Sequence, residues 1–211
     1  MNIVIIDYNI GNVKSISNAF KKFGIDTIIT NNKEAILKAD GVILPGVGAF
    51  AHGMENLKKY SLIDTLNLYV EKNKPLLGIC LGMQLLLEES EEFGNTKGLG
   101  FIKGKVIKIP IKQDKLPHVS WNDIKPKTLS WKNTILDSIK EKSDMYFVHS
   151  FVAVPESERN ILSVTEYGGV EFCSAVKKNN IYGTQFHPEK SGKIGLKVIE
   201  NFVKLLKGEL K

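Results

Sequence analysis

The sequence predicts an α/β fold in which a mostly parallel central sheet carries helices on both faces, with a small antiparallel β extension. As far as residue 87, short apolar runs alternate with segments whose apolar residues recur at helical spacing. From residue 94 onward, extended segments follow one another until a helical pattern returns at the C-terminus. Strands that alternate with helices pair in parallel, whereas consecutive strands favour antiparallel pairing. At 211 residues, the chain is expected to form one domain, 1–211.

The first half begins with a strand over 2–6, whose apolar residues do not alternate and are therefore expected to be buried on both faces. A helix follows with Val13, Ile16 and Phe20 on one face and Gly24 as its C-cap. The later elements of this half are strand 25–30, helix 31–38, strand 41–44, helices 53–59 and 61–72, a strand ending at 79, and a helix after 80.

The second half is expected to be rich in β-structure. Its extended segments are 101–110, 116–122, 145–154, 161–166, 170–176 and 181–186. A last helix carries Ile194, Val198, Phe202 and Leu205 on one face. Before these strands, the acidic run 88–92 is expected to end the helix that follows residue 80. Carboxylates there oppose the helix dipole, so one of them is a candidate to hold the amine of a ligand.

Cys80 is the candidate nucleophile. It stands in the turn Gly78-Ile79-Cys80-Leu81-Gly82, between an apolar strand and a helical pattern. This is the strand–turn–helix arrangement of a nucleophile elbow, with cysteine in place of serine. The glycines permit a tight turn, and the helix N-terminus favours a thiolate. A lone cysteine in an apolar run is more often a buried core residue, but the histidine described below favours the catalytic interpretation.

Two further stretches at strand ends complete the expected site. Pro45-Gly46-Val47-Gly48 can turn main-chain N–H groups towards an anion and is a candidate for half of an oxyanion hole; the alternative is an ordinary strand-to-helix connection. In Gln185-Phe186-His187-Pro188-Glu189, His187 can act as the base for Cys80 and Glu189 can orient its imidazole. Because ligands bind beyond the carboxyl ends of parallel strands, these stretches are expected to meet at one edge of the sheet.

Composition excludes several other classes of function. The net charge is +6, but Arg159 is the only arginine and the lysines alternate with acids, which favours a solvated surface over a nucleic-acid site. No apolar run approaches the ~18 residues of a membrane span, and the N-terminus lacks the features of a signal peptide. Cys80 and Cys173 do not make a disulfide framework, so a reducing cytoplasm is expected. The His and Cys spacing predicts no metal site, and no cofactor is expected.

At this point the sequence resembles the class I, or triad, glutamine amidotransferases, along nearly its whole length. Within that class it is similar to the glutaminase subunit of imidazole glycerol phosphate synthase. The elbow and the His-Pro-Glu motif are shared by the whole class, whereas Pro-Gly-Val-Gly, Trp-Asn and Glu-Lys-Ser indicate this subunit. The matching stretches are 7–12, 44–48, 78–84, 117–118 with 121–122, 146–150 and 185–191. The resemblance implies a flavodoxin-like parallel sheet.

The resemblance also implies a reaction. Cys80 attacks the carboxamide of L-glutamine, His187 protonates the leaving ammonia and later activates water, and Glu189 supports His187. The N–H groups of Val47 and Leu81 hold the oxyanion. The residues implied to bind glutamine are Gly46, Gln84, Glu92, His149, Ser150 and Phe151.

The resemblance further implies a heterodimer with a (β/α)8-barrel cyclase, which receives the ammonia and makes imidazole glycerol phosphate and an aminoimidazole carboxamide ribotide in histidine biosynthesis. Asn12, Trp121 and Lys190 are implied to lie at that partner's face. A glycine-bracketed loop that supplies the oxyanion donor only on docking would suppress idle hydrolysis, since one such donor is worth roughly 3 kcal/mol.

One departure leaves the ammonia acceptor open. Members of the histidine pathway usually read Pro-His-Met-Gly-Trp-Asn, and here Val119 and Ser120 replace Met and Gly. Paralogues of this subunit supply ammonia for the amidation of a surface-polysaccharide sugar, which is the second hypothesis. Two further hypotheses are less favoured. A non-catalytic scaffold is not expected to keep an intact triad, and a cysteine peptidase does not explain the acidic run 88–92.

Overall fold

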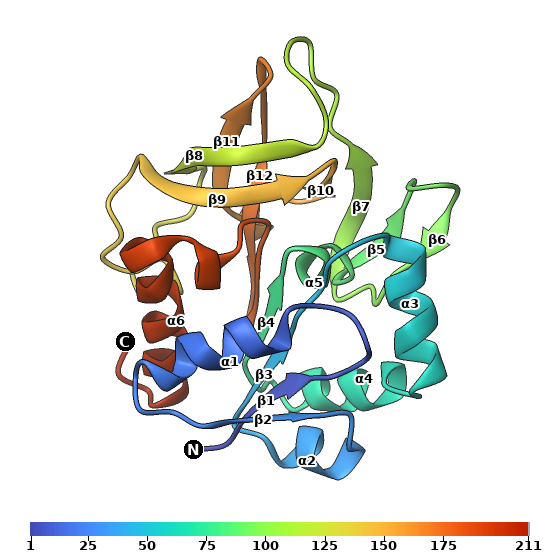
Figure 1. The fold of residues 1–211 in the computed structure, drawn as a ribbon, viewed down its shortest axis with the longest axis vertical. Coiled ribbons are helices and arrows are strands. Elements are labelled where there is room, and N and C mark those ends of the chain that lie inside the picture. The colour runs from blue at the N-terminus through green and yellow to red at the C-terminus, as the bar shows by residue number, and fades with distance from the viewer. Residues whose placement is uncertain (211) are drawn as a thin grey trace.

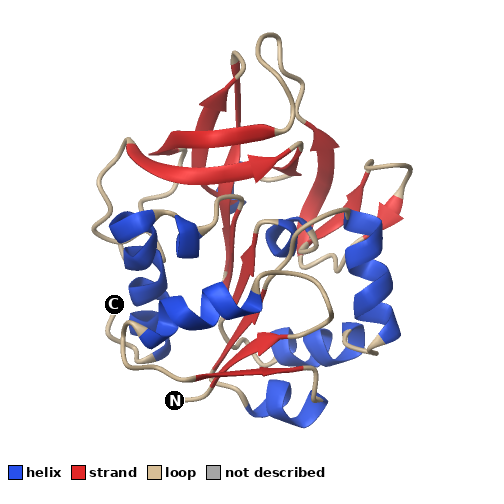
Figure 2. Cartoon of the chain, in the orientation of Figure 1, coloured by secondary structure: helices blue, strands red, loops and turns tan. Residues whose placement is uncertain are grey.

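The computed structural model describes residues 1–210 and has a nine-stranded mixed sheet at its centre, in the order β2-β1-β3-β4-β13-β12-β11-β8-β9. Its first five strands pair in parallel, and the remaining pairings, from β13–β12 to β8–β9, are antiparallel. Helices gather around the parallel half and strands dominate the other half (Figures 1 and 2). The predicted class is therefore confirmed, with an antiparallel part that is larger than expected.

The strands of the large sheet are β1 (Ile3–Ile6), β2 (Thr27–Thr30), β3 (Gly41–Leu44), β4 (Leu76–Ile79), β8 (His118–Pro126), β9 (Ser143–His149), β11 (Ile161–Tyr167), β12 (Val170–Lys178) and β13 (Ile181–Thr184). A second sheet has the order β10-β7-β5-β6 and contains β5 (Leu87–Ser90), β6 (Thr96–Lys97), β7 (Ile102–Lys108) and β10 (Phe151–Pro155).

The α-helices are α1 (Val13–Lys21), α2 (Lys33–Lys38), α3 (Phe50–Lys59), α4 (Ile63–Glu71), α5 (Leu81–Gln84) and α6 (Gly192–Leu206). Two short 3-10 helices are η1 (Glu158–Asn160) and η2 (Pro188–Lys190). None of the helices within residues 1–210 combines the length and the apolar character needed to cross a membrane.

Alternate residues of the parallel strands enter two separate cores, as the period of a strand requires. Ile3 and Ile5 pack with residues of α1 and α6, whereas Val4 and Ile6 pack with residues of α2, α3 and α4. The predicted helices on both faces are therefore present. The runs of consecutive apolar residues in β1 and β3 reflect this burial on both sides.

Two sequence-based predictions about the middle of the chain are wrong. The helix after Cys80 is a single turn, and the acidic run does not end it, because residues 87–90 form β5 between β6 and β7. The segment predicted as one strand over 145–154 is divided at Ser150 into β9 and β10. β9 pairs with β8 in the large sheet, whereas β10 pairs with β7 in the second sheet. The segment therefore joins the two sheets beside the end of β4.

Candidate active site

Cys80 lies on a strained turn between β4 and α5. Its backbone has φ +55° and ψ −112°, in a region that residues with a side chain rarely adopt, at a cost of about 1–3 kcal/mol. The backbone N–H of Cys80 donates to Thr184 O over 2.7 Å, which ties the turn to β13. The strain is thus held by the sheet, and it is the geometry of a nucleophile elbow.

The flanking glycines let the elbow approach β3 closely. A Cβ atom on Gly82 would stand 1.8 Å from the carbonyl oxygen of Leu44, and a Cβ on Gly78 would stand 2.6 Å from that of Gly82. Gly46 also lies against the elbow, where an added Cβ would stand 2.8 Å from the nitrogen of Gly82. Only glycine fits at these three close contacts, so the end of β3 packs directly on the first turn of α5.

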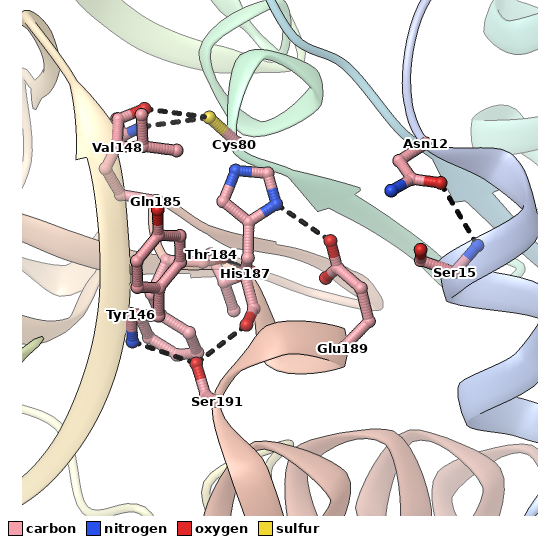
Figure 3. A network of polar contacts seen from close by, with 11 residues as sticks. Asn12, Ser15, Cys80, Tyr146, Val148, Thr184, Gln185, His187, Glu189 and Ser191 are labelled. Carbon is pink, nitrogen blue, oxygen red and sulfur yellow. Dashed lines mark hydrogen bonds and ion pairs between the residues drawn. The ribbon is translucent and has the colours of Figure 1, made fainter. Parts of the chain in front are cut away.

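His187 and Glu189 form a buried pair after β13. Nδ1 of His187 lies 2.8 Å from Oε1 of Glu189, and their side chains are 3% and 1% exposed. The His187 N–H donates to Tyr146 O, and the hydroxyl of Ser191 donates to His187 O, so the backbone is fixed as well. Because Nδ1 is engaged by Glu189, Nε2 faces the Cys80 side (Figure 3) and has no hydrogen-bond partner within residues 1–210.

The surroundings of His187 favour its protonated form. Burial lowers the pKa of His187, but the neighbouring Cys80 and Glu189 raise it by more, so the pKa lies well above the ordinary value. The imidazole can therefore take and hold a proton from the thiol. A cysteine, a base and an orienting carboxylate in this order are the arrangement that activates a nucleophile.

Cys80 has two further neighbours. Nε2 of Gln185 lies 3.7 Å from the thiol sulfur, and the sulfur lies 3.9 Å from Val148 O (Figure 3). Gln84 links this arrangement to β10, because its Nε2 donates to Phe151 O over 2.9 Å and to Oε1 of Gln185 over 3.0 Å. Gln185 is a site residue that the sequence analysis does not predict, and its only signal in the sequence is its position two residues before His187.

A cavity of about 490 Å³ opens at Cys80. It brings together most of the residues predicted to hold the oxyanion or bind substrate: Val47, Leu81, Gln84, Glu92, His149, Ser150 and Phe151. It also contains Gly48 of the predicted Pro45–Gly48 loop, and Pro117 and Val148, which lie in matching stretches but have no predicted role. Ala49 and Phe93 also line it, and no motif in the sequence indicates them. Gly46, predicted to bind substrate, is not among the lining residues and packs against the elbow instead.

The two predicted oxyanion donors enter the cavity from different elements. Leu81 is the first residue of α5, where the N–H has no partner within the helix. Val47 is 44% exposed and follows Pro45, whose carbonyl accepts a hydrogen bond from the buried Tyr8 hydroxyl over 2.5 Å. Tyr8 and the close packing of Gly46 therefore hold the start of the 45–48 loop, and Val47, the next residue, lines the cavity.

Glu92 has a contact of its own in the cavity wall. Its Oε2 accepts the backbone N–H of Phe50 over 2.7 Å, at the start of α3, where Ala49 provides no side-chain cap. Glu92 is only 8% exposed. Glu92 thus acts as the anion at the N-terminus of α3, and this contact fixes one oxygen at the cavity.

The three residues predicted to face a partner lie outside the cavity. Trp121 is 52% exposed and contacts Tyr146 edge-on, with ring centroids 5.9 Å apart. Nζ of Lys190 lies 5.9 Å from the centroid of the same Tyr146 ring. Asn12 caps α1 by accepting the N–H of Ser15 over 3.2 Å. Among residues 1–210, no group of three or more His, Cys, Asp or Glu side chains is placed to hold a metal ion.

Comparisons with known proteins agree with this geometry. The family model of class-I glutamine amidotransferases matches residues 4–206. Imidazole glycerol phosphate synthase subunit HisH 2 of Methanococcus maripaludis is 55% identical over 204 residues, which cover 96% of this chain and 98% of the relative. Subunit HisH of Methanocaldococcus jannaschii is 52% identical over 202 residues, with the same coverage.

Solved structures show the same fold at lower sequence identity. A crystal structure of a glutamine amidotransferase has a TM-score of 0.74 at 19% identity and covers 97% of this chain and 98% of that chain. The structure of PurLQS from Thermotoga maritima has a TM-score of 0.72 at 18% identity, with the same coverage. The chain belongs to the class-I glutamine amidotransferase family.

Proposed function

We propose that this chain hydrolyses L-glutamine to glutamate and ammonia, and supplies the ammonia for histidine biosynthesis as the glutaminase subunit of imidazole glycerol phosphate synthase. The observation that carries the chemistry is the elbow cysteine beside the buried His187–Glu189 pair, at a cavity with room for a small amino acid. The assignment to this subunit is supported by relatives of that name at 40–55% identity over nearly the whole chain. We also propose that 1–211 act as one amidotransferase domain.

The reaction proceeds in two halves. His187 accepts the thiol proton of Cys80, and the thiolate attacks the carboxamide carbon of glutamine. The negative oxygen of the tetrahedral intermediate accepts hydrogen bonds from the N–H groups of Leu81 and Val47. His187 then donates its proton to the leaving nitrogen, and ammonia departs from a γ-glutamyl thioester. In the second half, His187 removes a proton from water, which attacks the thioester and releases glutamate and the free thiol.

Glu189 and Gln185 hold this machinery in place. Glu189 accepts from Nδ1 of His187, keeps Nε2 directed at the thiol side and stabilises the imidazolium of each half-reaction. The amide of Gln185 donates towards the sulfur over 3.7 Å and therefore favours negative charge on it. We propose that Gln84, Glu92, His149, Ser150 and Phe151 bind the glutamine, because all five line the cavity at Cys80.

A cyclase subunit receives the ammonia, and we propose that it is a (β/α)8 barrel. The exposed face that carries Trp121, Tyr146 and Lys190 supports the docking site, since exposed aromatic residues are enriched at interfaces. Asn12 lies at the N-terminus of α1, and Figure 3 shows this end of the helix on the Glu189 side of the triad. The alternative acceptor, a surface-polysaccharide sugar, is not favoured by the names of the curated relatives.

The test mixes the purified chain with a candidate cyclase subunit and measures glutamate release from glutamine. We expect slow hydrolysis by the chain alone and faster hydrolysis in the complex when the acceptor nucleotide, a phosphoribulosyl-formimino carboxamide nucleotide, is added. Cys80→Ser is the control and is expected to be inactive. Failure of every cyclase to stimulate hydrolysis would refute the assignment, as would stimulation by a sugar acceptor alone.

A further inference from the structure

A buried tyrosine after β1 is hydrogen-bonded to the 45–48 loop. Tyr8 is the second residue after β1 and is 0% exposed. Its hydroxyl donates to Pro45 O over 2.5 Å. Asn56 on α3 fixes the backbone of Tyr8, because its side-chain amide donates to Tyr8 O over 3.0 Å. The reaction proposed for Cys80 does not use this hydroxyl, although the loop that the hydroxyl holds carries a predicted oxyanion donor.

The bond from Tyr8 is the only hydrogen bond that the backbone of 45–48 makes in the described part of the chain. The next backbone N–H that donates along the chain belongs to Phe50. Between these two points Val47 is 44% exposed, and a Cβ atom added to Gly48 would meet nothing within 4 Å. The loop is therefore held at its start and is loosely packed further on.

The bonded carbonyl lies close to the predicted donor along the backbone. The ring of Pro45 fixes its φ angle, and a peptide group is planar. A hydrogen bond that fixes the Pro45 carbonyl therefore fixes the whole peptide group between Pro45 and Gly46. The direction of the Val47 N–H then depends only on the two backbone dihedrals of Gly46. Gly46 is itself closely packed, because a Cβ on it would stand 2.8 Å from the nitrogen of Gly82 and 3.0 Å from the Tyr8 hydroxyl oxygen.

The Tyr8 hydroxyl is a permanent donor at physiological pH. Burial raises the pKa of Tyr8 well above its ordinary value, and the neighbouring Cys80 raises it further. The hydroxyl thus keeps its hydrogen, and the Pro45 carbonyl can only accept. Phenylalanine has the same ring but no hydroxyl, so Tyr8→Phe removes this bond and leaves the ring to pack as before.

We propose that Tyr8 is a positioning residue, which holds the Pro45 carbonyl and thereby directs the Val47 N–H at the oxyanion formed when Cys80 attacks. This role rests on the proposed glutaminase function. In Tyr8→Phe the buried Pro45 carbonyl would lose its partner, which is unfavourable. Because the loop makes no other backbone hydrogen bond among residues 1–210, it would turn to find a new partner, and the Val47 N–H would turn with it.

Kinetics of the complex with the cyclase subunit test this role. The negative oxygen exists only after attack, so a misplaced donor slows the reaction without weakening the binding of glutamine. In Tyr8→Phe, kcat should fall roughly 10- to 100-fold, somewhat less than on loss of a whole oxyanion donor, while KM stays within about twofold.

Tyr69→Phe is the matched control. Tyr69 is also 0% exposed, and its hydroxyl also donates to a proline carbonyl, Pro75 O, over 3.1 Å. Pro75 directly precedes β4, whereas the elbow follows the other end of that strand. Tyr69→Phe therefore removes the same kind of bond away from the site, and kcat and KM should both stay within about twofold.

Alkylation of Cys80 by iodoacetamide separates an effect on the loop from an effect on the elbow. The thiolate displaces iodide from the CH2 group, so no oxyanion forms and no oxyanion donor is needed. The alkylation rate of the chain alone, followed by mass spectrometry of the peptide that contains Cys80, should therefore agree within about twofold between Tyr8→Phe and the natural chain. NMR of the same chains should show shifted amide signals for residues 46–48 in Tyr8→Phe and unshifted ones in Tyr69→Phe.

Four results would overturn the positioning role. They are an unchanged kcat in Tyr8→Phe, an equal fall of kcat in Tyr69→Phe, unshifted amide signals of residues 46–48 in Tyr8→Phe, and alkylation that slows as much as kcat falls. The last result would place the effect at Cys80 itself. A natural complex that does not hydrolyse glutamine, in chains that show the expected amide shifts, would instead refute the proposed function.

Discussion

Gly82→Ala tests whether close contact between the elbow and β3 sets the geometry of the active site. The added Cβ would stand 1.8 Å from the carbonyl oxygen of Leu44, and both partners are backbone. Ordinary contact begins at 3.4 Å, so the elbow and the end of β3 must separate by about 1.6 Å. Because a misplacement of ~1 Å can cost a hundredfold in rate, kcat/KM should fall at least roughly 100-fold. The free energy of unfolding should fall by about 1–3 kcal/mol through overpacking.

Glutamate release by the complex and urea unfolding of the chain measure these two effects. Gly53→Ala in α3 is the matched control, since the atoms nearest to its Cβ would be the side chain ends of Leu85 and Leu81, at 3.2 Å and 3.3 Å. That variant should keep kcat/KM within about twofold, because flexible side chains can move by a few tenths of an ångström. A Gly82→Ala chain with natural activity would show that the close contact does not set the site.

Three further predictions concern single side chains of the site. Glu189→Gln keeps the shape of the side chain but removes the charge beside His187, so kcat should fall roughly 10- to 150-fold. The pKa of His187, measured by NMR titration, should fall towards its ordinary value. An unchanged kcat would contradict the triad. Glu92→Ala removes the anion at the N-terminus of α3, so urea unfolding should show a loss of about 1 kcal/mol in addition to a raised KM; unchanged stability would refute the capping role. Burial lowers the pKa of His149 to about 3, so between that pH and the ordinary pKa of 6.5 the unfolded chain binds more protons than the folded chain. The free energy of unfolding should therefore be full above pH 6.5 and should decrease as the pH falls towards 3. Urea unfolding should show a smaller decrease in His149→Gln, and an equal decrease would refute the assignment to this ring.

The parallel half of the fold could be predicted because its signals are local. β1, β3 and β4 are uninterrupted apolar runs, and the helices between them have apolar residues at helical spacing. The elbow was predictable for the same reason, since the glycines and Cys80 are adjacent in sequence. His187 and Glu189 lie two residues apart after a strand, so their pairing also has a short-range signal.

The wrong predictions concern segments whose structure depends on pairing with strands that are far away in the sequence. Leu85, Leu86 and Leu87 are all buried and suit a helix or a strand equally, and pairing of β5 with β7 selects the strand. The division of 145–154 at Ser150 depends on two partners, β8 and β7, that belong to different sheets. Likewise, the contact between the rings of His118 and His149 exists only because β8 and β9 pair in one register, and a single sequence does not specify that register.

The central claim is that Cys80 forms a covalent bond with the substrate. The most direct measurement mixes the complex with carbon-labelled glutamine, quenches it in acid and locates the label by mass spectrometry of peptides. We predict a γ-glutamyl group on the peptide that contains Cys80, and its loss together with glutaminase activity in Cys80→Ser. Cys173→Ala should retain both, because burial raises the pKa of Cys173 to about 12 and its thiol is not used. Label on another residue, or glutamine hydrolysis by Cys80→Ser at the natural rate, would contradict the account.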